Sequence, residues 1–217
     1  EWPPYFSDNL KDQGPLAAIT RAALKVRGHD VNILFMPWKR ALKEVEYGRF
    51  DMVLGAFDTP KRRKQFFYTE QIYSVDEYVI GLESKGINSF HSLKDLKDYT
   101  FGTTLGYSYS KEFAEAEYLA RQQVSSDLLN LRKLFIDRID FVVMNSAAFS
   151  DTLNKIPQQD RRNHVLLSPA LSTNGVYNLV SRRVSDSAQL LADFKFGLKT
   201  IKANGTYDAI IADFNIQ

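Results

Sequence analysis

One segment of the sequence carries side chains suited to holding an anion. Thr59 precedes Arg62 directly after the apolar run 52–56, which has the composition of a buried strand. The Arg62 guanidinium would then lie at the carboxyl end of that strand, where open α/β sheets bind ligands. A guanidinium is a planar fork of donors that can hold a carboxylate through two hydrogen bonds. The segment predicts a carboxylate clamp, the alternative being that the basic run 61–64 is a solvated surface.

A second candidate for anion binding is Ser108, which follows Gly106 where we expect a helix to begin. Free N–H groups and the helix dipole attract an anion at such a position, and a serine hydroxyl adds one donor. An ordinary helix N-cap would use the same residue type. Both interpretations fit the sequence.

Aromatic residues around these segments could form the walls of a binding site, because aromatic rings exclude water from a ligand and stack on its flat or cationic parts. With 15 Phe and 11 Tyr in the chain, core packing is the alternative for any of them. Arg40 could be a second anion donor, but its spacing from Glu44 favours a pair on a helix surface. The aromatic candidates are Tyr5, Trp38, Tyr73 and Trp2.

Composition excludes several other functions. The 28 Lys and Arg residues against 26 Asp and Glu give a net charge of +2, too balanced for the electrostatic attraction on which nucleic-acid binding depends. The absence of cysteine excludes disulfides, thiolate zinc sites and a cysteine nucleophile. The scattered His29, His91 and His164 lack the spacing of a helix-borne metal pair, and neither a Gly-x-Ser-x-Gly elbow nor a phosphate-binding P-loop is present. We therefore expect no metal, no cofactor and no catalysis.

The sequence predicts that strands and helices alternate along the chain of 217 residues, and these elements must position the residues above. Such alternation predicts an α/β protein with mostly parallel sheets flanked by helices. No apolar run approaches the roughly 20 residues that span a bilayer, so we expect a soluble chain. The expected strands are 31–35, 52–56, 78–82, 101–108, 141–144 and 176–180, and the expected helices are 15–28, 41–48, 111–121 and 128–135 with two more at the end.

Several segments, taken in this order, resemble the family 3 periplasmic solute-binding proteins, the polar amino-acid binding components of ABC importers and their sensor-domain relatives. The resemblance covers nearly the whole chain. The segments are Glu1-Trp2-Pro3-Pro4-Tyr5, Pro37-Trp38-Lys39-Arg40-Ala41-Leu42 with Gly48-Arg49-Phe50-Asp51, Thr59-Pro60-Lys61-Arg62, Ser92-Leu93-Lys94-Asp95-Leu96 before Gly102 and Gly106-Tyr107-Ser108, and Asn204-Gly205-Thr206-Tyr207.

The resemblance implies a two-lobed fold of the periplasmic-binding-protein type II, in which two hinge strands join the lobes and a ligand is enclosed when they close. Lobe 1 would comprise 1–76 and 178–217, and lobe 2 would comprise 77–177. It further implies a periplasmic monomer whose signal peptide has been removed, with a first strand missing ahead of Glu1. The partners would be a small-molecule ligand and either the permease of an ABC importer or a membrane sensor.

The resemblance also assigns roles to residues. Arg62 with Thr59 matches the family's carboxylate-binding segment, and the segment of Tyr107 and Ser108 would be the contribution of lobe 2. Asn145 stands where amino-acid binders carry an Asp for the ligand's α-ammonium, and an amide supplies a weaker, uncharged partner.

Two further positions bear on the choice of ligand. Phe57 stands where many members of the family have a small hydroxyl residue. Its larger aromatic ring would narrow the binding site or make it more apolar. A carboxylate or other polar solute without an ammonium group therefore fits as well as an amino acid, although Glu70 or Asp76 could supply a negative charge from elsewhere.

Three functions follow from this sequence. The first is a non-enzymatic protein that binds a small carboxylate-bearing solute. The second is the ligand-sensing domain of a membrane receptor or kinase. The third is a dehydratase-like enzyme acting on cyclic carboxylates, which would need a carboxyl general acid with a raised pKa, for which Glu70 and Glu1 are the candidates.

Overall fold

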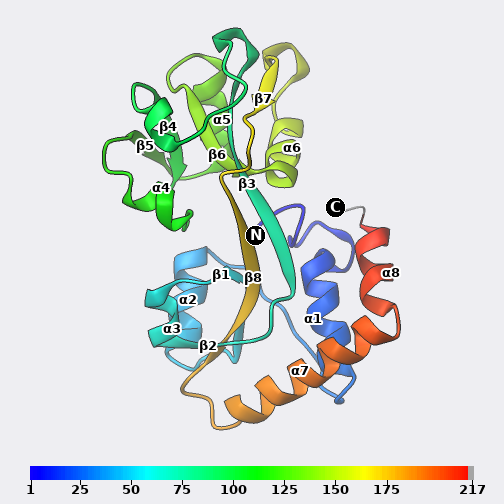
Figure 1. The fold of residues 1–217 in the computed structure, drawn as a ribbon. Coiled ribbons are helices and arrows are strands. Elements are labelled where there is room, and N and C mark those ends of the chain that lie inside the picture. The colour runs from blue at the N-terminus through cyan, green and yellow to red at the C-terminus, as the bar shows by residue number, and fades with distance from the viewer. Residues whose placement is uncertain (215–217) are drawn as a thin grey trace. The chain divides into compact units, whose positions relative to one another are not determined.

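The structure is a computed structural model that describes residues 1–214. Its contacts divide the chain into two compact units (Figure 1). Unit 1 comprises Glu1–Ser74 and the chain from Gly175 onward, and unit 2 comprises Val75–Asn174. Two long strands, β3 (Tyr73–Leu82) and β8 (Ser172–Ser181), each contain one of the boundaries. The lobe boundaries expected from the sequence remain a prediction.

Unit 1 is built around β8, with β1 and β2 both paired to it antiparallel. Helices α2 and α3 lie on one side of these strands, and α1 and α7 lie on the other (Figure 1). Gly197 allows α7 to pack closely on α1, because a Cβ at this position would lie 1.8 Å from the Ala23 carbonyl oxygen. The elements are η1 (Lys11–Gln13), α1 (Pro15–Lys25), α2 (Trp38–Glu46), β1 (Met52–Phe57), α3 (Pro60–Gln65), β2 (Phe66–Tyr68), α7 (Ser187–Ala203) and α8 (Thr206–Asp213).

Unit 2 contains both parallel and antiparallel strand pairs. Strand β4 pairs parallel with β5 and β6, whereas β3 pairs antiparallel with β6 and β7. Its core is rich in phenylalanine, and the Phe101 ring contacts those of Phe113 and Phe141. The elements are η2 (Glu83–Lys85), η3 (Leu93–Leu96), β4 (Thr100–Thr104), α4 (Lys111–Glu115), β5 (Ala120–Val124), α5 (Asp127–Phe135), β6 (Phe141–Asn145), α6 (Ser146–Asn154), η4 (Gln158–Asp160) and β7 (His164–Leu166).

The α/β class is confirmed, and the sheet is mixed rather than mostly parallel. The expected strands at 52–56, 78–82, 141–144 and 176–180 fall within β1, β3, β6 and β8. Both closing helices are also present as α7 and α8. The parallel pairs are confined to unit 2, where the segments between the strands contain α4 and α5.

The strand expected at 31–35 is absent. The segment keeps the alternation of a strand, with Val31, Ile33 and Phe35 partly buried and the residues between them exposed, but it forms no ladder. A strand needs a neighbour to satisfy its backbone N–H and C=O groups. Within residues 1–214 no strand is paired with it.

The prediction of a helix at 111–121 is wrong for the second half of that segment. Helix α4 ends at Glu115, and Ala120–Val124 forms β5 beside β4. The Arg121 guanidinium donates to the carbonyl oxygens of Phe113 and Ala116 near the end of the helix. Ladder hydrogen bonds to β4 here override the helical propensity of Arg and Gln side chains.

None of the helices in the described residues has the length and apolar character needed to cross a bilayer.

Candidate functional site

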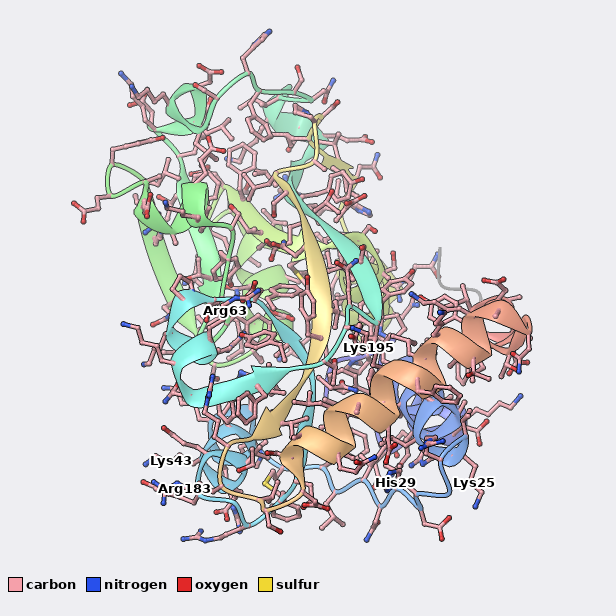
Figure 2. All side chains as sticks on the ribbon, turned by 60° about the horizontal axis from the view of Figure 1, so that its bottom comes forward. Lys25, His29, Lys43, Arg63, Arg183 and Lys195 are labelled. Carbon is pink, nitrogen blue, oxygen red and sulfur yellow. The ribbon has the colours of Figure 1, made fainter. Side chains whose placement is uncertain are left out.

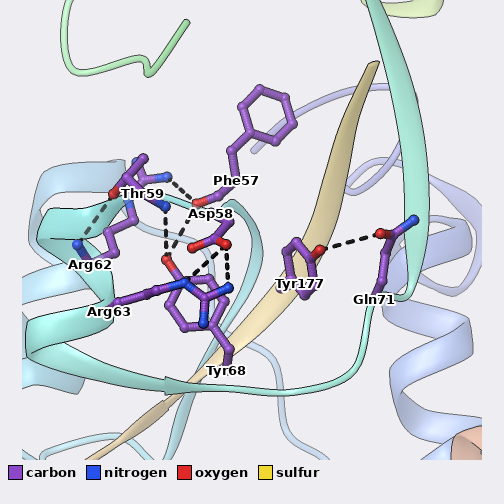
Figure 3. Close-up of polar contacts among 8 residues, drawn as sticks. All are labelled: Phe57, Asp58, Thr59, Arg62, Arg63, Tyr68, Gln71 and Tyr177. Carbon is purple, nitrogen blue, oxygen red and sulfur yellow. Dashed lines mark hydrogen bonds and ion pairs between the residues drawn. The ribbon is translucent and has the colours of Figure 1, made fainter. Parts of the chain in front are cut away.

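Arg62 is held in place by its own turn of helix. Thr59 is the N-cap of α3, and its Oγ1 accepts a hydrogen bond of 3.2 Å from the Arg62 backbone N–H (Figure 3). The guanidinium Nη1 donates to the Phe57 carbonyl oxygen at 3.0 Å. Its Cζ atom lies 5.4 Å from the centroid of the Trp38 ring, within the range of a cation–π contact. The side chain is thus fixed between the end of β1 and α2.

The Arg62 side chain is a buried cation, with only 9% of the residue exposed. Burial lowers the pKa of its guanidinium, although arginine remains charged in proteins. The neighbouring Arg63 forms an ion pair with Asp58, whereas Arg62 has no ion pair with a carboxylate in residues 1–214. A buried charge without a counter-ion is costly, which makes Arg62 the strongest candidate in unit 1 for contact with an anion.

Tyr68 fixes the loop that precedes Arg62. Its hydroxyl accepts from the Thr59 N–H at 3.3 Å and donates to the Phe57 carbonyl at 3.5 Å (Figure 3). Burial raises the pKa of the Tyr68 hydroxyl. The Tyr177 ring of β8 lies 5.6 Å from the Tyr68 ring, and its hydroxyl donates to the side chain of Gln71 at 3.2 Å (Figure 3).

The predicted aromatic residues of unit 1 gather in two contact groups. The Trp2 ring lies 5.5 Å from Phe57 and 4.6 Å from Tyr5, and Tyr5 lies 5.8 Å from Tyr73. The indole of Trp38 forms the second group with Arg62. Tyr5 is buried, whereas Phe57, Trp38 and Tyr73 are only partly buried.

Arg40 belongs to the surface, as its spacing indicates. Its Nε lies 3.9 Å from the Glu44 carboxylate one turn away, and its side chain is largely exposed. Glu44 makes its shorter contact, 2.8 Å, with Arg49. Arg40 therefore makes a weak surface pair, typical of i,i+4 neighbours on a helix.

In unit 2, Asn145 ends β6 and is the N-cap of α6. Its Oδ1 accepts from the Ala148 N–H at 2.8 Å, and its Nδ2 donates to the Asp76 carbonyl at 3.4 Å. The residue is buried. Both ends of the amide are thus engaged with backbone, which leaves it less able to bind a ligand ammonium strongly.

Glu77 is the acidic residue that sequence reasoning missed. It lies opposite Asn145 in the register of β3 and β6 and is only 5% exposed. Its Oε2 accepts from the Ser172 hydroxyl at 3.1 Å and from the Asn174 amide at 3.0 Å. Burial raises the pKa of this carboxyl to about 7, despite these hydrogen bonds. A carboxylate at the start of the apolar run 78–82 was the available signal.

The other acidic residues that the sequence suggested, Asp76, Glu70 and Glu1, each have a hydrogen-bond or ion-pair partner within the chain. The Asp76 carboxylate accepts from the Thr173 hydroxyl at 2.6 Å. Glu70 forms an exposed ion pair of 3.2 Å with Lys195, which Figure 2 labels. Glu1 accepts from the Ser7 hydroxyl at 2.9 Å.

Ser108 lies in the loop 105–110 and not at a helix start. Helix α4 begins at Lys111, and its N-cap is Ser110, whose Oγ accepts from the Phe113 N–H at 3.2 Å. Tyr107 in the same loop is 44% exposed, and its hydroxyl donates to Asp127 Oδ2 at 3.4 Å. The helix-terminus argument for Ser108 is therefore wrong, because the first free N–H groups of α4 come later in the chain.

The three histidines have separate structural surroundings. His29 Nε2 lies 2.9 Å from Asp193 Oδ2, and the centroid of the His164 ring lies 4.6 Å from that of the Phe149 ring in a tilted arrangement. Among residues 1–214, no group of three His, Asp or Glu side chains is arranged to hold a metal ion.

Comparisons with known proteins address the fold and the family. The model of the bacterial extracellular solute-binding proteins, family 3, matches residues 1–216. The arginine-binding extracellular protein ArtP of Bacillus subtilis (strain 168) is 29% identical over 89 residues, which are 41% of this chain and 34% of ArtP. The match thus spans about a third of that relative's length.

Solved structures share the fold at lower identity. A histidine kinase sensor domain with similarity to periplasmic binding proteins has a TM-score of 0.82 at 22% identity, over 98% of this chain and 91% of that one. A mutant of ArgBP from T. maritima has a TM-score of 0.79 at 18% identity, over 98% and 90%. Together with the match of the family model over nearly every residue, these likenesses lead to one assignment: the chain belongs to the family 3 bacterial extracellular solute-binding proteins.

Proposed function

We propose that this protein is a non-enzymatic periplasmic binding protein that captures a small carboxylate-bearing solute and delivers it to the permease of an ABC importer. The observation that carries the proposal is Arg62, a buried guanidinium without a carboxylate partner among residues 1–214, fixed by Thr59 and the Phe57 carbonyl. A ligand carboxylate would supply the missing counter-ion through a bidentate pair. Partly buried Phe57, Trp38 and Tyr73 would shield that pair from water.

The proposal includes a closure step. The ligand would be enclosed between the lobe of 1–76 and 178–217 and the lobe of 77–177, with Tyr107, Ser108 and Asn145 as contributions from the second lobe. A ligand that contacts both lobes binds the closed arrangement better than the open one, and this difference supplies the signal that the membrane partner reads.

The choice between an amino acid and an ammonium-free carboxylate depends on the second lobe. Asn145 carries no charge and caps α6, which disfavours a strong ammonium site. Glu77 lies opposite it and can be ionised near neutral pH, because its pKa is about 7. We propose an amino acid or a related small carboxylate as the ligand class.

A ligand-sensing domain of a membrane kinase is the second candidate, favoured by the likeness to a histidine kinase sensor domain. It would use the same binding residues and differ only in its partner. A dehydratase-like activity would need a carboxyl general acid, and Glu77 has a suitable pKa. Its Oε2 is already occupied by Ser172 and Asn174, so we retain the non-enzymatic proposal.

A thermal-shift screen tests the proposal, with α-amino acids, their deaminated carboxylates, amines and sugars as probes. A ligand at 100 times its Kd stabilises the folded state by about 2.7 kcal/mol, which is readily detected. We expect hits among the carboxylates, and each hit should be lost in Arg62→Ala. Hits only among amines or sugars would contradict the proposal.

A further inference from the structure

The carboxylate of Asp127 connects the end of β4 with the loop that carries Tyr107. Asp127 is the first residue of α5, and its Oδ1 accepts a hydrogen bond of 2.6 Å from the Thr104 hydroxyl at the end of β4. Its Oδ2 accepts from the Tyr107 hydroxyl at 3.4 Å. Thr104 is buried, whereas Tyr107 is 44% exposed. The carboxylate therefore bridges the interior of unit 2 and an exposed candidate ligand residue.

Asn130 fixes the direction of the hydrogen bond from Thr104. Its side chain is buried, and its Nδ2 donates to Thr104 Oγ1 at 3.0 Å. The Thr104 oxygen is the acceptor there, so its single proton is directed at Asp127. The amide has little room to move, because a Cβ at Gly102 would lie only 2.6 Å from Asn130 Oδ1. Asn130 and Thr104 thus form a chain of donors that ends on the carboxylate and favours its ionised form.

The titratable groups around Asp127 in the described residues are Tyr107, Tyr109 and Lys155. The Tyr109 hydroxyl accepts from a backbone N–H of β4 at 2.7 Å, and Lys155 forms an ion pair of 2.7 Å with Asp151. Burial raises the pKa of Asp127 above its usual 3.8, against the effect of its hydrogen bonds. Burial, followed by the charge of Asp127, raises the pKa of Tyr107. Tyr107 therefore keeps its proton at neutral pH.

We propose that Asp127 is a positioning residue that makes the Tyr107 hydroxyl a hydrogen-bond acceptor toward the ligand, so that Tyr107 binds an N–H donor of the ligand and not its carboxylate. A phenol has one proton to donate. With that proton directed at Asp127, the oxygen of Tyr107 presents lone pairs to any other partner. The inference rests on the proposed function, in which Tyr107 contacts the ligand.

This arrangement gives unit 2 a negative charge behind an exposed acceptor. Asn145 is uncharged, and its Oδ1 already accepts from the Ala148 N–H. The charge of Asp127 polarises the Tyr107 hydroxyl, and an acceptor polarised in this way binds a cationic N–H more strongly than an isolated hydroxyl does. Asp127 would thus determine specificity without touching the ligand.

The first test needs no ligand and uses the natural chain with carbon-13 at Cζ of its tyrosines. Protonation of Asp127 removes the charged acceptor of Tyr107, so the Tyr107 Cζ resonance should shift with a midpoint above pH 3.8. Tyr118, a tyrosine of the same unit that is 47% exposed, is the matched control and should not follow this titration. A Tyr107 resonance that titrates identically in Asp127→Asn would overturn the proposal, as would one that does not move between about pH 3 and 8.

The second test compares binding within matched pairs: L-glutamate with glutarate, and L-leucine with 4-methylpentanoate. In Asp127→Asn the new amide can donate to the Tyr107 oxygen, which frees the Tyr107 proton for the ligand. We expect this variant to lower the preference for the amino acid over its deaminated analogue by roughly tenfold in calorimetric titration. In a Tyr107→Phe background, Asp127→Asn should leave the preference unchanged.

The outcomes separate this inference from the proposed function. An equal preference in the natural chain and Asp127→Asn would overturn the inference, and the proposed function would stand if Arg62→Ala still abolished binding. A loss of preference that persists in the Tyr107→Phe background would overturn the role of Tyr107 and leave a direct effect of the Asp127 charge. If neither pair binds to the natural chain, the specificity claim fails, whereas the tyrosine titration still decides whether Asp127 accepts from Tyr107.

Discussion

Glu77 and Asn145 stand directly opposite each other on β3 and β6, so a buried carboxyl and a buried amide share one face of the unit 2 sheet. The carboxyl accepts hydrogen bonds from Ser172 and Asn174 of β8, and the amide caps α6. An acidic side chain is thus absent at position 145 but present at position 77 on the adjacent strand. Each residue yields a prediction.

The first prediction concerns the pH dependence of stability. The pKa of Glu77 rises from 4.5 to about 7 on folding, because burial disfavours its charged form. The folded state therefore binds this proton more tightly than the unfolded state. The resulting stabilisation is complete below pH 4.5 and is lost as the pH rises through about 7.

Glu77→Gln removes this titration and keeps a similar shape. Relative to the variant, the natural chain should lose up to about 3 kcal/mol of unfolding free energy between pH 4.5 and about 8. Urea unfolding of both proteins across that range is the measurement. Parallel pH curves for the two chains would show that Glu77 is not perturbed.

The second prediction concerns ligand charge. Asn145→Asp retains an N-cap oxygen for the Ala148 N–H and adds a charge at a position where an ammonium group could bind. We expect roughly tenfold tighter binding of an α-amino acid, with a smaller change for its deaminated analogue. Calorimetric titration with both members of the pair measures this, and an equal change for both would contradict it.

The third prediction concerns the turn that holds Arg62. Thr59→Ala removes the oxygen that accepts from the Arg62 N–H and should destabilise the fold by about 1 kcal/mol while weakening ligand binding. Thr59→Ser keeps that oxygen and should restore both properties. Urea unfolding and calorimetry are the measurements. If Thr59→Ala and Thr59→Ser behave alike, the cap does not position Arg62.

The strands whose ends place the candidate site residues were predictable, because each is a continuous apolar run with polar or turn-forming residues on both sides. The run at 52–56 predicts β1, and Arg62 follows at its end as the pattern requires. Local signals were sufficient here because the strand and its loop are contiguous in sequence.

The errors arise where a distant partner decides the structure. Segment 31–35 has a strand pattern but no pairing neighbour in the described chain, whereas 120–124 has helix-forming side chains and gains a ladder with β4. Glu77 was missed because its proximity to Asn145 depends on the register of two strands far apart in sequence. Sequence periodicity contains no information about such pairings.

The most direct test of the central claim is a calorimetric comparison of a carboxylate hit with its carboxamide, using the natural chain, Arg62→Ala and Arg63→Ala. Arg63 is the matched control, because it lies next in sequence but is exposed and paired with Asp58. If Arg62 is the carboxylate clamp, the natural chain should bind the carboxylate at least about tenfold more tightly than the carboxamide, a difference of about 1.4 kcal/mol. Arg63→Ala should keep this preference, and Arg62→Ala should lose it. An undiminished preference in Arg62→Ala would contradict the account.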